Sequence, residues 1–228
     1  MMSMTESMIN ELYLAGKDCL WDYDFLQFDL RDGTSGGGFD VNRAMEAICK
    51  AAYHLLDIAA KNGHALAAFK LSKLCSDPNL WIVMVNEVGK EEKLMKQALE
   101  GMVEQAMKNP SLAYDAGFAY LYESRTEDID KAERCFKAGA AANDASCIWQ
   151  LGEIAKKKGR RIPAFHYYLK AAKLGQGMAM YEVGQCYEKG EGTPADKAEA
   201  IRWYKLCVKS KYAAQSDAEA RLKALTKK

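Results

Sequence analysis

The chain has 228 residues, enough for one or two ordinary domains or for one elongated array of repeats. Apolar residues make up 49% and charged residues 28%, which is too apolar for a disordered chain and typical of a folded one. The 32 basic and 31 acidic residues nearly cancel. This balance argues against general binding to nucleic acid or to an anionic membrane, because both need a positive field.

The first residues and the cysteines indicate a compartment. Residues 1–11 include Glu6 and Glu11 and no continuous apolar run, unlike a signal peptide or a membrane span. The seven cysteines are odd in number, form no CxxC pair and lie mostly in apolar helical patterns, where a free thiol acts as a small hydrophobe. We therefore expect a cytoplasmic protein in a reducing environment.

The expected elements are nearly all helices, because Ala, Leu, Lys and Glu dominate at helical spacing and strand signals are almost absent. Taken in chain order, a first helix recurs five times with an aromatic residue at one place and Gly or Ser three residues later. The aromatic residues are Tyr13, Phe69, Tyr114, Trp149 and Tyr181, and the small residues are Gly16, Ser72, Gly117, Gly152 and Gly184. Such agreement predicts a helical repeat.

A second helix follows each first helix. Four copies carry a large apolar pair there, at 55–56, 135–136, 167–168 and 203–204, and the copy around 94–107 lacks the aromatic residues. One continuous array over 1–228 is expected. Its repeats are placed at about 8–63, 64–108, 109–143, 144–175 and 176–210, with a C-terminal capping helix in 211–228. The acidic and aromatic segment 21–33 either extends the first helix or folds against the array.

The best-preserved copy is AMYEVGQCYEKGEGTPADKAEAIRWYKLC, residues 179–207. It resembles a Sel-one-like repeat, a relative of the tetratricopeptide repeat, in its small residue, aromatic, aliphatic-Gly pair, Tyr, GxG, Asp and Trp-Tyr. The resemblance implies an all-α fold, a right-handed α/α solenoid superhelix of stacked hairpins. It also implies a scaffold for protein partners. Independently, a lone hairpin cannot bury its apolar face, and stacking does so.

The glycine-rich turn Gly190–Thr193 invites comparison with a phosphate-binding loop. Such a loop needs a strand, a turn and a helix, whereas the preceding element here is a helix. We interpret the two glycines as a helix stop. Thr193 and Pro194 are expected to start the next helix as N-cap and first helical residue, with Asp196 completing a capping box.

No constellation of residues indicates catalysis. His54, His64 and His166 lack metal-ligand spacing to any cysteine, so neither a metal site nor a cofactor is expected. Buried structural thiols are the simplest interpretation of the cysteines. A thiol- or metal-dependent enzyme stays open as an alternative.

Binding residues are expected on the side of each first helix that faces away from its paired helix, which lines the concave face in this architecture. Phe118 and Tyr122 are unusual for solvated positions and favour an aromatic groove flanked by charge. The candidate partner-binding residues are Tyr114, Phe118, Tyr122, Trp149, Glu153, Lys157, Tyr181, Gln185 and Lys189. For Tyr114, Trp149 and Tyr181, packing between repeats is an equally open interpretation.

The sequence thus predicts a non-catalytic scaffold or adaptor that binds a protein or peptide, as a monomer or weak homodimer. It predicts no nucleic-acid or membrane partner. An immunity protein that neutralises a cognate toxin by binding is a second possibility, and no residue distinguishes it from the first.

Overall fold

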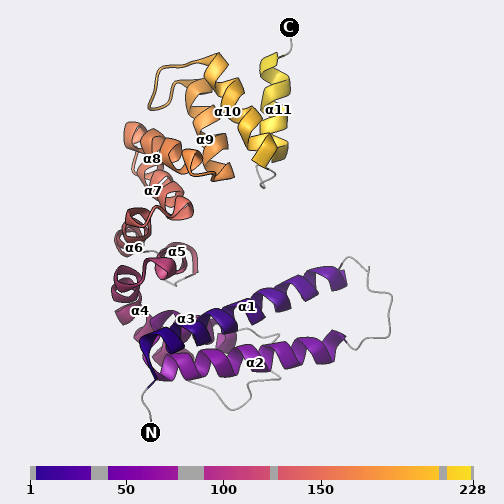
Figure 1. The fold of residues 1–228 in the computed structure, drawn as a ribbon, viewed down its shortest axis with the longest axis vertical. Helices are drawn as coiled ribbons and strands as arrows, with labels where there is room; N and C mark the ends of the chain where they lie inside the picture. Colours follow the sequence, from indigo (N-terminus) through magenta and orange to yellow (C-terminus); the bar gives the residue numbers. More distant parts are fainter. Residues whose placement is uncertain (1–3, 32–40, 77–89, 124–127, 211–214, 227–228) are drawn as a thin grey trace. The chain divides into compact units, whose positions relative to one another are not determined.

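The computed structural model describes residues 4–31, 41–76, 90–123, 128–210 and 215–226, and every regular element in these ranges is a helix (Figure 1). This confirms the all-α class. The elements are α1 (Glu6–Arg31), α2 (Val41–Lys61), α3 (Ala65–Ser76), α4 (Lys90–Lys108), the 3-10 turn η2 (Pro110–Leu112), α5 (Ala113–Phe118), the π-helical turn η3 (Ala119–Glu123), α6 (Ile129–Ala141), α7 (Ala145–Lys157), α8 (Arg161–Lys173), α9 (Gly177–Lys189), α10 (Lys197–Ser210) and α11 (Gln215–Thr226).

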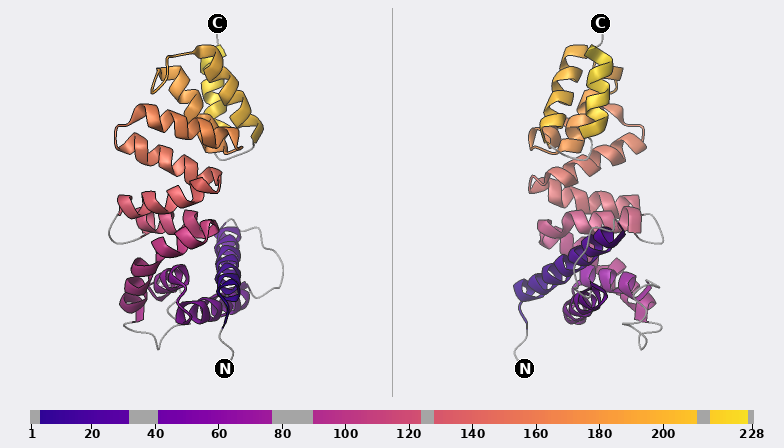
Figure 2. Two further views of the ribbon diagram at one scale, coloured as in Figure 1. Left: turned by 60° about the vertical axis from the view of Figure 1, so that its left-hand side comes forward. Right: turned by 90° about the vertical axis from the view of Figure 1, so that its right-hand side faces the viewer.

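The chain forms two compact units, Met1–Gln105 and Ala106–Lys228. In the first unit α1 packs against α2, and α2 packs against α3. In the second, α5 to α11 pack in order, each against the next, as stacked hairpins (Figures 1 and 2). This is the sequential packing expected of a repeat solenoid. The right-handed twist, the repeat boundaries and the single continuous array stay predictions.

The acidic and aromatic segment that begins at Trp21 extends the first helix, because α1 continues to Arg31. Of the two alternatives, extension of the first helix is therefore correct up to Arg31. The glycine-rich link 32–40 and the insertion 77–89 lie outside the described residues.

Each later first helix, or in the case of α5 the 3-10 turn η2 that leads into it, begins with a side-chain cap. The cap stands three residues before the small or apolar residue that opens the repeat frame, and its side chain accepts a hydrogen bond from a backbone N–H of the first turn. The capping side chains, each with the residue whose N–H donates to it, are His64 with Ala67 (3.2 Å), Asn109 with Ser111 (3.2 Å), Asp144 with Cys147 (2.7 Å) and Gln176 with Ala179 (2.9 Å). Capping satisfies backbone donors that have no partner inside the helix.

The start of α10 differs from the prediction. The helix begins at Lys197, and its cap is Asp196, whose carboxylate accepts from the N–H groups of Ala198 and Glu199 at 2.9 and 3.0 Å. Thr193 and Pro194 therefore lie in the loop before the helix, so the predicted Thr-Pro start was wrong. The glycine stop was correct, because Gly190 ends α9 in the left-handed conformation at φ 72°.

In the copies whose small residue is glycine, that residue receives a large side chain from its paired helix. A Cβ atom on Gly117 would lie 2.5 Å from the Phe136 ring, and one on Gly184 would lie 2.6 Å from the Tyr204 ring. Gly152 faces Tyr168 in the same way. Close approach of the two helices therefore requires glycine, as the sequence predicted.

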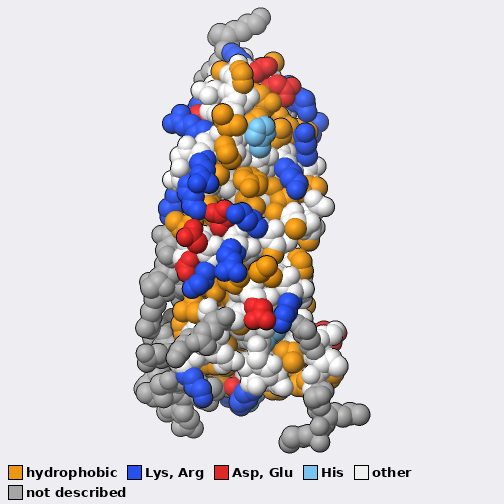
Figure 3. Space-filling model, turned by 90° about the vertical axis from the view of Figure 1, so that its left-hand side faces the viewer, with side chains coloured by type: hydrophobic (Ala, Val, Ile, Leu, Met, Phe, Trp, Pro, Cys, Tyr) orange, Lys and Arg blue, Asp and Glu red, His pale blue; other side chains and the backbone are white. Residues whose placement is uncertain are grey.

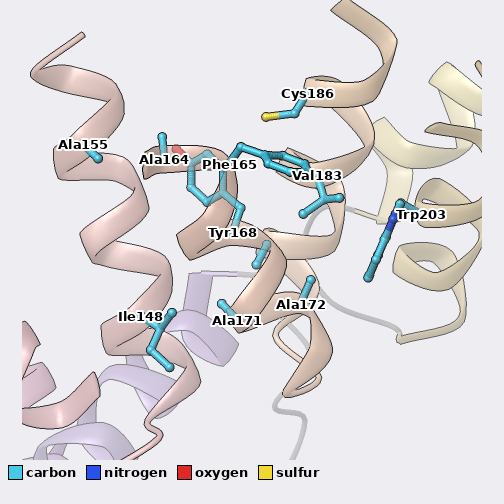
Figure 4. Close-up of a cluster of buried hydrophobic side chains, with 11 residues drawn as sticks. Ile148, Ala155, Ala164, Phe165, Tyr168, Ala171, Ala172, Val183, Cys186 and Trp203 are labelled. Carbon is cyan, nitrogen blue, oxygen red and sulfur yellow. The ribbon is translucent and has the colours of Figure 1, made fainter. Parts of the chain in front are cut away.

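The core of the second unit lies between these pairs. In Figure 4, side chains from α7, α8, α9 and α10 meet around Phe165, Tyr168 and Val183, which are buried. A further cluster joins α10 to α11 around Tyr204 and the buried Ala218. The last helix thus packs as an additional layer, and its assignment as a cap stays a prediction.

Candidate functional site

Three aromatic side chains follow one another along α5 and η3, and we name Tyr114, Phe118 and Tyr122 the aromatic ladder. The rings of Tyr114 and Phe118 are stacked with centroids 5.9 Å apart, and those of Phe118 and Tyr122 are 4.7 Å apart. Residues four apart on a helix are neighbours on its surface, so the spacing in the sequence produces this continuous strip.

Exposure rises along the aromatic ladder. Tyr114 and Phe118 are half-buried, whereas 58% of Tyr122 is accessible to solvent. Tyr114 also approaches Phe136 of α6, at 6.2 Å between centroids, and its hydroxyl shares a hydrogen bond with the side chain of Gln150. One end of the strip is therefore anchored in the core, and the other end is exposed to solvent.

The backbone under the aromatic ladder changes from α-helix to the π-helical turn η3, in which Tyr122 lies. Single π turns are rare in helices and occur frequently at functional sites. The N–H of Asp128, where the next described range begins, donates to the carbonyl of Tyr120 in this turn at 3.1 Å. The sequence frame identified the aromatic residues but gave no signal for this turn.

Trp149 and Tyr181, two further candidates, both pack against neighbouring side chains of the second unit. Trp149 lies against the core cluster of α7, α8, α9 and α10, and the ring of Tyr181 lies 5.6 Å from that of Tyr204. In the first unit the equivalent Tyr13 and Phe69 are completely buried. Packing thus accounts for much of this aromatic series, while the role of Trp149 and Tyr181 in partner binding stays a prediction.

Glu153 has a structural contact that the sequence did not suggest. It accepts a hydrogen bond of 2.7 Å from the hydroxyl of Tyr168, the ring that rests on Gly152. Burial raises the pKa of Tyr168, and the hydrogen bond to Glu153 raises it further. The first helix therefore holds Tyr168 at two points: the ring lies against the glycine, and the hydroxyl is hydrogen-bonded to the glutamate.

The last repeat shows the same combination. The hydroxyl of Tyr204 donates to Glu188 at 2.7 Å, and Arg221 of α11 donates to both oxygens of that carboxylate. A bidentate pair fixes orientation as well as charge. Glu188 and Arg221 were not among the predicted residues, and a Glu near the Gly of a copy with a downstream Tyr is the signal that could have found Glu188.

The remaining candidates lie on the later first helices. Gln185 is half-buried and lines a small pocket beside Lys156 and Tyr168. Lys157 and Lys189 are exposed at the C-terminal ends of α7 and α9, where a cation is favourable to the helix dipole. Among the nine candidate residues, contacts between rings join only the three members of the aromatic ladder.

The thiols of the second unit are poor nucleophiles. Cys135, Cys147, Cys186 and Cys207 are all buried. Burial raises the pKa of Cys135 to about 12 and that of Cys186 to about 11, and it also raises the pKa of Cys147 and Cys207. Since the thiolate is the reactive form, these environments oppose the thiol chemistry that an enzyme would need.

We expect these four thiols to react with iodoacetamide at pH 7.5 at least about a hundredfold more slowly in the folded protein than in urea, because both burial and raised pKa values suppress the thiolate. Mass spectrometry of labelled peptides measures each site separately. Cys19, which is half-buried, is the internal comparison. Rapid labelling of any of the four in the folded protein would contradict a purely structural role.

Two further findings concern the described part of the chain. Within it, no three His, Cys, Asp or Glu side chains gather as a group able to hold a metal ion. Among the helices of the same ranges, none combines the length and apolar character needed to cross a bilayer.

Stacked two-helix hairpins, each with a small residue facing a large side chain of its partner, define a helical repeat protein. The Sel1 repeat model matches residues 49–64, 110–144, 150–176 and 177–206. The chain belongs to the Sel1 repeat family.

Curated relatives share one stretch of the chain. DAP3-binding cell death enhancer 1 of Mus musculus is 47% identical over 51 residues, which are 22% of this chain and 10% of that protein. The Rattus norvegicus protein of the same name is 45% identical over 51 residues. The chain thus covers about a tenth of the length of these relatives.

Solved structures resemble the chain in fold. A protective antigen of uropathogenic Escherichia coli strains, c5321, which displays an SLR fold, aligns with a TM-score of 0.57 and 20% identity over 78% of this chain and 36% of its own. A Sel1 repeat protein from Oxalobacter formigenes aligns with a TM-score of 0.46 and 25% identity over 58% of this chain and 98% of its own.

Proposed function

We propose that this Sel1 repeat protein is a non-catalytic adaptor that binds a segment of a protein partner on the aromatic ladder. The observation that carries the proposal is the continuous strip of three rings that ends in the exposed Tyr122. Exposed aromatic side chains with one anchored end are typical of interaction hot spots, because they bury a large area at little cost in side-chain entropy.

Two other observations support binding over catalysis. The buried thiols have raised pKa values, so thiol chemistry is disfavoured. The mouse relative that shares 51 residues with this chain is named for binding DAP3, and repeat scaffolds of this kind present extended surfaces to partners. In addition to the aromatic ladder, the residues proposed to bind the partner are Trp149, Glu153, Lys157, Tyr181, Gln185 and Lys189.

The test replaces the two outer rings together, as Phe118→Ala with Tyr122→Ala. We expect a partner captured by the unmodified protein to bind at least about thirtyfold more weakly to this variant, because each ring contributes roughly 1–2 kcal/mol when it is buried by a partner. Capture from a cell extract quantified by mass spectrometry identifies the partner, and calorimetry with the purified partner measures the dissociation constant.

The matched control is Leu206→Ala, which removes another exposed apolar side chain, on α10. It is expected to leave the dissociation constant unchanged. Circular dichroism must show that both variants keep their helix content. Equal binding by the unmodified protein and the double variant would remove the aromatic ladder as the site.

A further inference from the structure

A hollow lies between α6, α7 and α8 in the second unit of the chain, on other elements than the aromatic ladder. Its volume is about 290 Å³. We name it the basic groove, and its lining residues are Glu133, Lys137, Leu151, Ile154, Ala155, Lys158, Arg160, Pro163 and Tyr167. None of these residues belongs to the aromatic ladder or to the sequence-predicted site.

The floor of the basic groove is apolar and held in place by the core. Leu151, Ile154 and Ala155 of α7 are buried, and Tyr167 packs against the core cluster of α7, α8, α9 and α10. Pro163, in the first turn of α8, continues this apolar surface outward. A volume of this size with a preformed apolar floor accommodates one large apolar side chain.

The rim carries more positive than negative charge. Lys137 and Lys158 both contact Glu133, at 2.7 and 2.6 Å, and Lys158 lies 3.5 Å from Asp130 as well. Thus one lining carboxylate is shared by two lining lysines. On this face, Figure 3 shows Lys and Arg side chains, with fewer Asp and Glu side chains among them, beside hydrophobic ones over the region of α6 to α8.

The third lining cation, Arg160, stands where a cation is unfavourable. It is the N-cap residue of α8, its side chain makes no capping hydrogen bond, and the first turn contains no acidic residue. The N-terminus of a helix carries partial positive charge, so carboxylates are favoured there and cations are not. The chain places at this point a charge that an incoming carboxylate would neutralise.

We propose that the basic groove binds an acidic peptide segment of a partner protein, with one apolar side chain on the floor and flanking carboxylates on Arg160, Lys137 and Lys158. Charge complementarity selects the acidic segment, and the apolar floor distinguishes it from a simple polyanion. The inference does not depend on the aromatic ladder, because the two sites share no residue. Either site can be removed without the other.

Fluorescence anisotropy with three labelled decapeptides tests the proposal on the full chain. The first is rich in Glu with a central Leu, the second has Ser in place of that Leu, and the third is rich in Lys with a central Leu. We expect the first to bind at least about tenfold more tightly than either of the others, since only it satisfies both the rim and the floor. Absence of this preference, including equal binding of the Leu and Ser peptides, overturns the proposal.

Arg160→Glu is the decisive variant, and Lys197→Glu is its matched control. Both reverse the charge of an exposed side chain at a helix N-terminus, of α8 and α10 respectively, where an acidic residue suits the dipole. We expect Arg160→Glu to weaken binding of the acidic Leu peptide at least about tenfold without lowering the melting temperature, and Lys197→Glu to leave binding within about twofold. Equal losses in both variants would mean nonspecific attraction and would overturn the proposal.

Discussion

Gly184→Ala is expected to lower the free energy of unfolding by about 1–3 kcal/mol, although alanine is the better helix former. The added Cβ would lie 2.6 and 2.7 Å from two ring atoms of Tyr204, closer than real Cβ contacts allow. That ring has no room to move, because it is completely buried and its hydroxyl is bound to Glu188. The substitution therefore forces α9 and α10 apart.

The same substitution should change sign when the ring is absent. In a Tyr204→Ala background the clash disappears, and Gly184→Ala should then stabilise the protein by about 0.5–1 kcal/mol through helix propensity. Urea unfolding of the four proteins in this double-mutant cycle measures both values. A loss of similar size in the two backgrounds would show that the ring is not the cause.

Acidification from pH 7 to pH 4 is expected to remove up to about 3 kcal/mol of stability through His64. Burial lowers the pKa of His64 to about 4 from its usual 6.5. Its ring is stacked on Tyr13 at 4.5 Å, Nδ1 accepts from the N–H of Ala67, and Nε2 lies 3.0 Å from Oδ1 of Asn10. This arrangement uses the neutral ring, because a protonated Nδ1 could not accept.

The sign follows from proton uptake. Below pH 6.5 the unfolded chain protonates this histidine, while the folded chain resists until about pH 4. The stabilising contribution is thus fully present above pH 6.5 and is lost progressively between 6.5 and 4. Since other groups also titrate, the measured quantity is the difference between the unmodified protein and His64→Gln in urea unfolding across this range.

The control for this experiment is His166→Gln, which removes an exposed histidine on α8. It should keep the steep pH dependence, whereas His64→Gln should flatten it. If His64→Gln and the unmodified protein lose stability in parallel, the buried histidine does not govern acid sensitivity.

Much of the fold could be predicted because the repeat imposes one packing problem several times. Gly117, Gly152 and Gly184 recur at the same place since each must admit a large ring from the paired helix. The caps could have been found too, because His64, Asn109, Asp144 and Gln176 stand at one place in the same frame. The start of α10 was misplaced because Thr193-Pro194 is a strong local signal, and Asp196 has the competing carboxylate.

The candidate site was predictable in part. Helical spacing placed Tyr114, Phe118 and Tyr122 on one side of their helix, in a predicted aromatic groove that also included Trp149. The ring contacts join the first three of these residues, and the groove as a binding site stays a prediction. Spacing could not show that Glu153 is held by Tyr168 or that Trp149 packs on the core, because these contacts depend on side chains from other helices. The basic groove was missed for the same reason, since its residues come from three helices.

The sequence by itself determined the helical class, the repeat, and the glycines that the repeat requires, because these follow from local periodicity and from a steric need that is the same in every copy. Only the tertiary structure decided which aromatic residues are consumed by packing and which, like Tyr122, remain exposed. It also decided where charges that are far apart in the sequence meet, as where Glu133 of α6 pairs with Lys158 at the end of α7. Burial and charge clustering depend on neighbours in space, and the one-dimensional pattern does not specify those neighbours.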